Sequence, residues 1–153
     1  MHALHPRVRV RWGLVGLLAV LVVGAVLAAV VHFLLELTPL LGVAGAVLLV
    51  PVVVAYVVAL YRSWGYDLEA DALVLERGVL TEVDTAVPYV RIQHVDTRRG
   101  PLDRLLGLGQ VVVYTAGSRG ADVTIPGLAP DDARELRNRL RDLAVESEPE
   151  DAV

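Results

Sequence analysis

Hydrophobic residues follow two different patterns along this chain, and the change lies near residue 65. From Trp12 to Tyr61 the sequence is almost continuously apolar, and apart from tyrosine its ionisable side chains are His32 and Glu36. Beyond Tyr66 apolar and polar residues alternate. A long apolar stretch is typical of helices in lipid, whereas alternation is typical of strands with one face in water. The pattern predicts a membrane-embedded N-terminal part followed by a β-rich domain.

The apolar stretch is long enough for two membrane-spanning helices, at about residues 12–35 and 40–61. Each exceeds the length needed to cross a hydrocarbon core of about 30 Å. Residues 36–39 between them permit only a tight reversal, and Pro39 is tolerated at or before the start of a helix. We therefore expect an antiparallel transmembrane hairpin over residues 12–63.

A cleaved signal peptide is the alternative for the first apolar run, because Arg7, Arg9 and Arg11 resemble the charged region that leads such peptides. The apolar core of a signal peptide is only about 7 to 15 residues long. The first run is longer, and the second follows it with no small-residue cleavage site between them. We therefore expect both spans to be retained.

Small residues recur in both spans and would allow the helix backbones to approach closely. They are Gly13, Gly16, Gly24 and Ala28 in the first span and Gly42, Ala44, Gly45 and Ala46 in the second. We expect them to pack the two helices of the hairpin against each other. A seam between copies of the chain is the alternative use.

His32 and Glu36 form a candidate intramembrane polar pair. They are four residues apart, so on a continuous helix they would share one face, as a two-ligand metal site or a proton relay requires. Both lie near the end of the first span, within reach of water and headgroups, and no third ligand is evident nearby. We expect interfacial capping here, with chemistry as the alternative.

The alternation predicts about seven short strands between residues 64 and 145, in a curved sheet or partly open barrel. The segments are Tyr66–Ala70, Leu73–Leu75, Val79–Val83, Val87–Ile92, a continuation beyond Gln93, Gln110–Thr115 and Asp122–Ile125, with a turn at Gly117–Gly120 and an end at Pro126–Gly127. Val90 and Ile92 are assigned inward, which leaves Tyr89, Arg91 and Gln93 outward. Val95 is out of phase with Ile92, and this predicts a β-bulge near Gln93 and His94.

The last element predicted is an amphipathic helix that packs on the sheet. Its apolar stripe is Ala133, Leu136, Leu140 and Leu143. Pro130 suits its first turn, and Asp131 and Asp132 suit the positive end of the helix dipole. A short helical turn at Leu102–Leu106, closed by Gly107, is also expected. Residues 146–153 form an acidic tail that we expect to be disordered.

Charge divides the chain in the same way as hydropathy, within a mean hydropathy of +0.55. Residues 1–65 contain four arginines and one glutamate, a charge of +3, so the formal total of −4 leaves −7 for the remainder. A domain this acidic would be repelled by phosphate, which argues against nucleic acid as a partner. The arginines flank the spans, so residues 1–11, which form a basic N-terminus, and the C-terminal domain are both expected on the cytoplasmic side.

No catalytic constellation is evident in the sequence. Cysteine is absent, which excludes disulfides, thiol nucleophiles and thiolate metal sites. Asp96 lies near His94, and Ser118 lies in a glycine-rich turn, but neighbouring side chains along a strand alternate between its faces. Nothing therefore supports a nucleophile with an oriented base, and we expect neither enzymatic activity nor a cofactor.

Several motifs of the C-terminal part resemble those of the bacterial pleckstrin-homology membrane proteins, the YdbS-like bPH2 family. They are Glu76–Leu80, Val87–Val95, Arg104–Gly109, Tyr114–Gly117 and Ile125–Leu128, followed by the amphipathic helix. The resemblance covers nearly the whole chain, because members of that family commonly have two spans ahead of the domain. It implies a pleckstrin-homology-like domain over residues 64–145 and a non-enzymatic role. Phosphoinositide binding is disfavoured, because the first turn contains Glu69 and Asp71 where related eukaryotic domains place basic residues.

A basic stretch of the domain is the candidate interaction surface. It consists of Tyr89, Arg91, Gln93, Arg98, Arg99 and Arg104. The alternative is that Arg91 pairs with an acidic neighbour and that Arg98 and Arg99 lie in a solvated loop. The leading hypothesis is a membrane-anchored interaction module, integral to the lipid bilayer, that binds a protein partner or another copy of itself. The alternatives are lipid-headgroup sensing and a subunit of a membrane enzyme or transporter that uses His32 and Glu36.

Overall fold

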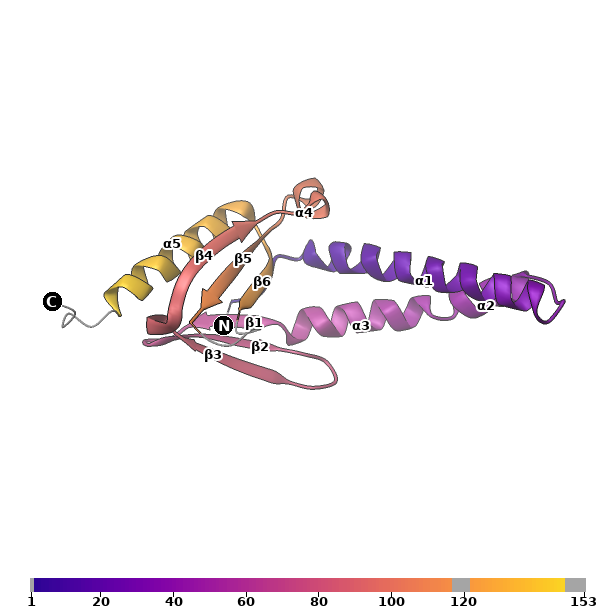
Figure 1. The fold of residues 1–153 in the computed structure, drawn as a ribbon, viewed down its shortest axis with the longest axis horizontal. Helices are drawn as coiled ribbons and strands as arrows, with labels where there is room; N and C mark the ends of the chain where they lie inside the picture. Colours follow the sequence, from indigo (N-terminus) through magenta and orange to yellow (C-terminus); the bar gives the residue numbers. More distant parts are fainter. Residues whose placement is uncertain (1, 117–121, 148–153) are drawn as a thin grey trace. The chain divides into compact units, whose positions relative to one another are not determined.

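The computed structural model describes residues 2–116 and 122–147 (Figure 1). The chain forms two compact units, which are described separately. One unit is helical and comprises Arg9–Tyr61. The other, called the β unit below, comprises residues 1–8 together with residues 62–153. The predicted turn at Gly117–Gly120 and most of the predicted acidic tail lie outside the described residues.

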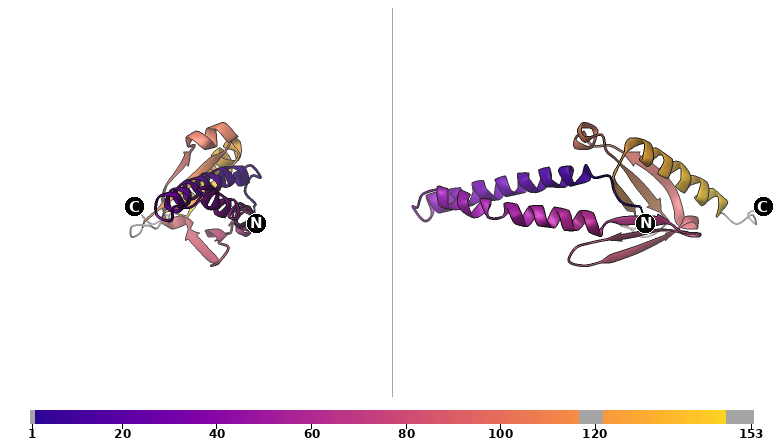
Figure 2. Two further views of the ribbon diagram at one scale, coloured as in Figure 1. Left: turned by 90° about the vertical axis from the view of Figure 1, so that its right-hand side faces the viewer. Right: turned by 180° about the vertical axis from the view of Figure 1, so that it is seen from behind.

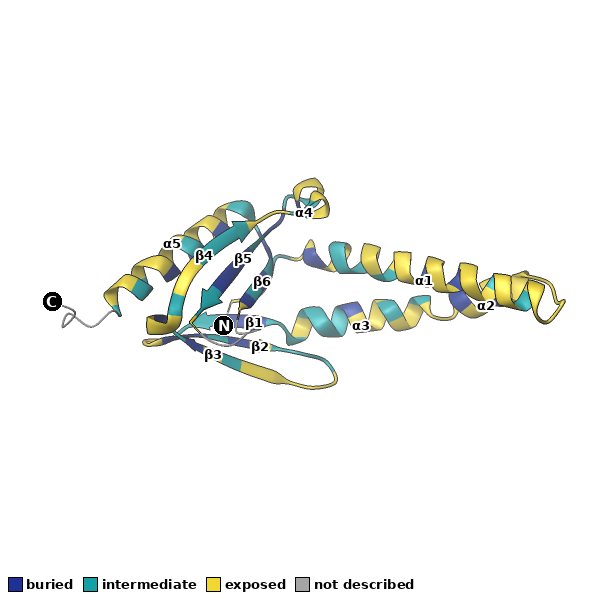
Figure 3. Cartoon of the chain, viewed as in Figure 1, coloured by how far each residue is buried: buried dark blue, intermediate teal, exposed yellow. Residues whose placement is uncertain are grey.

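The N-terminal part contains the predicted pair of spans. Helix α1 is Val8–Phe33, and the second segment consists of α2 (Leu40–Val47) and α3 (Val50–Ser63). The segments Val8–Phe33 and Leu40–Ser63 are each long and apolar enough to cross a membrane. Most of their large apolar side chains are exposed, as lipid-facing side chains would be, and Figure 3 shows this along α1 and α2.

The second span is interrupted at its middle, although a continuous helix was predicted. Helix α2 ends at Val47, and the Leu49 amide donates to the Ala46 carbonyl at 3.0 Å in a tightened last turn. Pro51 explains the break, because proline has no N–H to donate to the Val47 carbonyl and its ring clashes with that group. The chain then resumes as α3.

Small residues bring the two spans into close contact, as predicted. A Cβ atom built on Gly42 would lie 2.5 Å from the Ala28 backbone nitrogen, and one on Gly24 would lie 2.8 Å from the Cβ of Ala46. Gly16 faces Val53 in the same way, at 2.5 Å. Backbone contact of this kind is available only where one partner lacks a side chain.

The β unit contains six strands in two antiparallel sheets in its described residues, rather than one curved sheet of seven strands. The first sheet has the order β1 (Gly65–Leu68), β2 (Ala72–Arg77) and β3 (Val83–Pro88). The second has the order β4 (Ile92–Arg98), β5 (Gly109–Thr115) and β6 (Val123–Leu128). The short helix α4 (Pro101–Leu106) joins β4 to β5 and ends at Gly107 with a φ of +64°, as predicted.

Two predicted strands are wrong because backbone constraints override the alternation. The segment Val79–Val83 is mostly a reversal, since Gly78 takes a φ of +114° and β3 begins only at Val83. The segment Val87–Ile92 contains the junction of the two sheets: Pro88 ends β3, and a 3₁₀ turn at Tyr89–Arg91 leads into β4. The predicted bulge is confirmed by a register shift between Ile92 and His94.

Strand β6 continues through the point at which the prediction ended it. Pro126 and Gly127 lie inside the strand, and Leu128 pairs with Gly109. The register shifts between Gly109 and Val111, opposite this point, so the missing N–H of proline is accommodated in a bulge. Gly127 takes a φ of +64° there.

Helix α5 (Pro130–Glu146) covers the second sheet, as Figures 1 and 2 show from opposite sides. The predicted stripe is confirmed, because Ala133, Leu136 and Leu140 are buried and Leu143 is half-buried. Pro130 starts the helix and two aspartates occupy its first turn. The core is completed by side chains of both sheets: Leu73, Leu75, Val87, Leu108, Val111, Val113, Val123, Ile125 and Leu128.

The N-terminal segment, residues 2–8, belongs to the β unit, which the sequence pattern did not indicate. Leu4 is 2% exposed and Val8 is fully buried. The His2 and Tyr66 backbones exchange hydrogen bonds of 2.7 and 3.1 Å, and the His5 amide donates to the Gly127 carbonyl at 2.8 Å. Residues 2–8, which lead into the first span, therefore belong to the same folded unit as the strands that follow the second span.

Replacing Leu4 by alanine should destabilise the β unit by roughly 2–4 kcal/mol, the range for a buried leucine. The control is Val145→Ala, because Val145 is 65% exposed and its truncation should change stability by less than about 0.5 kcal/mol. Denaturation in detergent, followed by Trp64 fluorescence in a Trp12→Phe background, reports on the β unit alone. Equal stability of the two variants would show that the N-terminal segment is not packed.

Replacing Gly42 by alanine should force the two spans apart and cost roughly 1–3 kcal/mol of hairpin stability, as overpacking does. Gly45 is the matched control, since nothing lies within 4 Å of a Cβ built there. Gly45→Ala should be neutral or slightly stabilising because alanine is the better helix former. Unfolding in mixed micelles of increasing sodium dodecyl sulfate content measures both, and an equal response would contradict the close packing.

Candidate functional site

The predicted interaction surface is divided between the two ends of β4. Arg91 and Gln93 lie at its start, whereas Arg98 and Arg99 lie at its end and Arg104 follows on α4. All five side chains are exposed. A strand of this length spans about 20 Å, so one small ligand cannot contact both groups. The structure therefore separates Arg91 and Gln93 from the others. Within that second group the Arg98 side chain reaches Tyr114, whereas the Arg99 side chain donates to the Leu108 carbonyl.

Tyr89 was predicted to point outward, and this prediction is wrong. Its side chain is 1% exposed, and its hydroxyl donates to the Glu69 carbonyl at 2.9 Å. The cause is the 3₁₀ turn at Tyr89–Arg91, which breaks the two-residue alternation on which the prediction rested. Burial raises the pKa of this phenol. Tyr89 is therefore part of the core and not of an exposed surface.

His32 and Glu36 do not share a helix face. Helix α1 ends at Phe33, and Glu36 lies beyond it with a φ of +52°. The His32 ring packs edge-on against Phe33, with ring centres 4.9 Å apart. Both polar side chains are exposed at the reversal. Within residues 2–116 and 122–147, no group of three histidine or carboxylate side chains is placed to hold a metal ion.

The side chains of His94 and Asp96, which the sequence reasoning set aside, are in contact. Residues two apart on a strand share a face, and here the His94 Nε2 lies 2.8 Å from the Asp96 Oδ1. The His94 ring also lies 5.9 Å from that of Tyr114. Both members of the pair are well exposed, at 67% and 42%. Ser118, the hydroxyl considered with them, lies outside the described residues.

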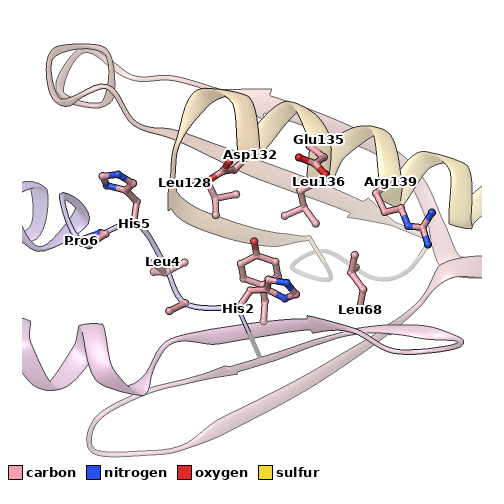
Figure 4. Close-up of a pocket in the computed structure, with 12 residues that line it drawn as sticks. His2, Leu4, His5, Pro6, Leu68, Leu128, Asp132, Glu135, Leu136 and Arg139 are labelled. Atoms are coloured by element: carbon pink, nitrogen blue, oxygen red, sulfur yellow. The ribbon is translucent and has the colours of Figure 1, made fainter.

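A cavity of about 460 Å³ lies between the N-terminal segment, β1 and α5, all within the β unit (Figure 4). Figure 4 shows His2, Leu4 and His5 of the N-terminal segment on one side and Asp132, Glu135 and Arg139 of α5 on the other, with Leu68 of β1 below Arg139. Its apolar lining comes from Leu4, Leu68, Leu128 and Leu136, and its polar lining comes from His2, His5, Tyr66, Asp132, Glu135 and Arg139. This mixture of apolar walls and a few convergent polar groups is typical of a binding site.

Strand β1 lines one side of the cavity. Its outer edge, the one that does not pair with β2, forms backbone hydrogen bonds with the N-terminal segment. Tyr66 pairs with His2 through both of its backbone groups, and the two side-chain rings stack with their centres 5.4 Å apart. Leu68 is the next residue that faces this edge, because orientations alternate along a strand. Its amide is held by the Asp67 carboxylate at 3.0 Å.

The electrostatic field at the cavity is set by the first two turns of α5. Burial raises the pKa of Tyr66, and the nearby carboxylates of Asp132 and Glu135 raise it further. Both effects oppose formation of a phenolate, through desolvation and through like charge. The same carboxylates would favour a positively charged group in the cavity, and Arg139 limits the total negative charge.

Sequence reasoning missed this site because its lining comes from three distant segments. Residues 2–8 were assigned to the basic N-terminus that precedes the first span, and a segment this short cannot show a hydrophobic period. The signals present were Leu4 and Val8, two apolar residues among charged ones, four positions apart. Asp132 was assigned to the positive end of the last helix, where it lies, but nothing in the sequence indicated that Asp132 and Glu135 border a cavity.

The comparisons with known proteins agree on one family. Residues 9–144 match the model described as "Bacterial PH domain". The chain is also similar to the UPF0699 transmembrane protein YdbS of Bacillus subtilis (strain 168), with 34% identity over 106 residues. That alignment covers 67% of this chain and 65% of the relative, just under two thirds of its length. No solved structure matches the chain. The resemblance to the YdbS-like bPH2 proteins is confirmed.

Tyr66 should ionise at a higher pH than an ordinary tyrosine, whose pKa is 10.0. Because its pKa is raised in the folded state, the neutral phenol contributes fully to stability below pH 10 and loses that contribution as the pH rises through the folded pKa. Absorbance at 295 nm, compared between the natural chain and Tyr66→Phe, isolates this titration. Asp132→Asn with Glu135→Gln should lower the pKa in part, whereas Asp131→Asn should change it little. A Tyr66 that titrates below pH 10 would contradict the account.

Proposed function

Because the chain belongs to the bacterial PH domain family and carries two helices suited to cross a membrane, we propose that it is a membrane-anchored, non-enzymatic interaction module. In this proposal the hairpin tethers the β unit at the cytoplasmic face. The β unit binds an extended segment of a protein partner in the cavity between β1, α5 and residues 2–8. Confinement to the membrane raises the effective concentration of the module for partners in the same membrane.

One observation carries this proposal: the edge of β1 beside the cavity already holds extended chain, through the pairing of His2 with Tyr66. Adding a strand to an exposed sheet edge is a general mode of peptide recognition, in which backbone hydrogen bonds supply affinity and side-chain pockets supply specificity. Leu68 continues that edge and lines the cavity. The apolar lining favours a partner with an aliphatic side chain there.

The charge of the cavity favours a partner segment with a basic residue. Asp132 and Glu135 stand on one side of α5, one turn apart, and both line the cavity. A lysine or arginine of the partner would pair with them, and the pair would set the register and direction of the bound segment. The acidic first turn, with Glu69 and Asp71, disfavours a phosphoinositide at that end of the domain.

The cytoplasmic placement is supported by the distribution of charge. Arg7, Arg9 and Arg11 precede the first span and Arg62 closes the second, while the reversal at residues 34–39 contains no basic residue. Excess arginine near the ends of spans favours the cytoplasmic side. A membrane enzyme or transporter that uses His32 and Glu36 has no specific support, because these side chains do not share a face.

A photo-crosslinking residue at position 139, which lines the cavity, should capture a partner in native membranes. Position 141 is the matched control, because it lies on the same helix but outside the cavity lining. We expect an adduct from position 139 that is absent from position 141. The adduct should weaken several-fold in Asp132→Asn with Glu135→Gln and persist in Asp131→Asn.

The mass of the adduct separates the two kinds of partner. An adduct of twice the chain mass would assign the cavity to a second copy of this chain, and any other mass would assign it to a different protein. Equal adducts from both positions, or an adduct that does not respond to loss of the two carboxylates, would contradict the proposed site.

A further inference from the structure

Two connections between strands of the β unit, the turn between β2 and β3 and the segment that contains α4, have exposed leucine side chains. Leu80, in the turn between β2 and β3, is 93% exposed. On α4, Leu105 is 80% exposed and Leu102 is 39% exposed. An exposed leucine by itself is ordinary, so the position of these loops in the domain decides what they do.

The turn between β2 and β3 lies at the end of the first sheet where the chain leaves the second span. Gly65, two residues after the end of α3, pairs with Glu76, and Arg77 pairs with Val83 across the turn. Arg62 and Ser63 line a small cavity together with residues of this turn, Gly78 and Glu82 among them. The turn that bears Leu80 therefore lies beside Arg62 and Ser63, the residues at the end of the second span.

Helix α4 lies beside the start of the first span in the same way. The Arg7 guanidinium donates to the Leu106 carbonyl at 3.5 Å. Val8, the first residue of α1, packs directly against Gly127 of β6, and β6 pairs with the start of β5, which follows α4. Each crossing of the membrane thus has one leucine-bearing loop beside it.

Helix α4 is firmly held, so the exposure of its leucines does not come from a loose loop. The Asp103 carboxylate is buried and accepts from the Gly100 amide at 3.0 Å. The Leu108 amide donates to the Asp103 carbonyl at 2.7 Å, and the Arg99 Nε donates to the Leu108 carbonyl at 3.0 Å. These bonds fix the orientation that points Leu105 away from the core.

The charge around α4 complements an anionic surface. Three exposed arginines lie in or next to α4: Arg104 is in the helix, Arg99 precedes it, and Arg7 donates to the Leu106 carbonyl. The acidic side chain within α4 is Asp103, which is buried in its capping role. An apolar helix face flanked by arginine is the composition of interfacial membrane anchors, which combine buried apolar area with attraction to anionic lipid. The turn that bears Leu80 has Glu82 and Asp84 instead, so its contact would be apolar.

We propose that the β unit rests on the bilayer through these two loops. Leu105 and Leu102 of α4 and Leu80 of the turn between β2 and β3 enter the headgroup region, and the arginines around α4 bind phosphates of anionic lipids. The domain is then held at two further points beside its two covalent links to the spans. This lipid contact is separate from the protein-binding cavity proposed above, which is lined by other residues.

The absence of cysteine from the chain allows this contact to be measured at single sites. The full-length variants Leu105→Cys, Leu80→Cys and Val145→Cys are labelled with an environment-sensitive dye and reconstituted into vesicles that contain nitroxide-bearing lipids. Val145 is the control, because it is 65% exposed at the far end of α5. The vesicles contain phosphatidylcholine alone or with phosphatidylglycerol.

We expect the lipid nitroxides to quench the labels at positions 105 and 80 several-fold more than the label at position 145. Quenching at either position no greater than at position 145 would overturn the proposal. A label at position 105 that reports an apolar environment without lipid quenching would also overturn it, since a protein would then cover α4.

The role of the arginines is tested in the same vesicles. Phosphatidylglycerol should increase quenching at position 105, and Arg104→Gln should reduce that increase, whereas Arg141→Gln on α5 should leave it unchanged. If phosphatidylglycerol did not change the quenching at position 105, the proposed binding of anionic lipid by the arginines would be wrong.

Discussion

The pairing of the N-terminal segment with the β unit is the interaction on which the architecture depends. Residues 2–8 are fixed by backbone bonds to Tyr66 and Gly127 and by burial of Leu4 and Val8. The chain then enters the first span directly, because Val8 is also the first residue of α1. Both ends of the hairpin are therefore attached to one folded body.

The two parts of the chain are suited to different solvents, the spans to lipid and the β unit to water. In the spans, most large apolar side chains face outward, and the two helices contact each other through glycine and alanine. Lipid is as apolar as these side chains, so the hydrophobic effect does not favour helix association there and close backbone packing takes its place. In the β unit, apolar side chains face inward and the two sheets and α5 enclose a core. In the arrangement proposed above, the exposed leucines of α4 and of the turn between β2 and β3 lie at the boundary between these two environments.

The features that could be predicted from the sequence are those set by long or strongly periodic patterns. The two spans, the reversal before Leu40, the stripe of α5 and the bulge in β4 are confirmed. The predictions were wrong where a single residue overrides the backbone conformation that the hydrophobic pattern indicates. Pro51 interrupts the second span, Gly78 turns a predicted strand into a reversal, and Pro88 with the 3₁₀ turn divides one predicted strand between two sheets and buries Tyr89. The cavity could not be predicted, because its walls come from the two ends of the chain and from β1, and no local pattern reports contacts between such distant segments.

The central claim is that residues 2–8 are an integral part of the β unit, and hydrogen exchange of the full-length chain in nanodiscs tests it most directly. The amide of His5, bonded to Gly127, should exchange as slowly as the amides of β1 and β6 and should become unprotected together with them when denaturant is added. If the amides of residues 2–8 exchanged at the rate of an unstructured peptide while the strands stayed protected, the N-terminal segment would be a free leader and the account would be wrong.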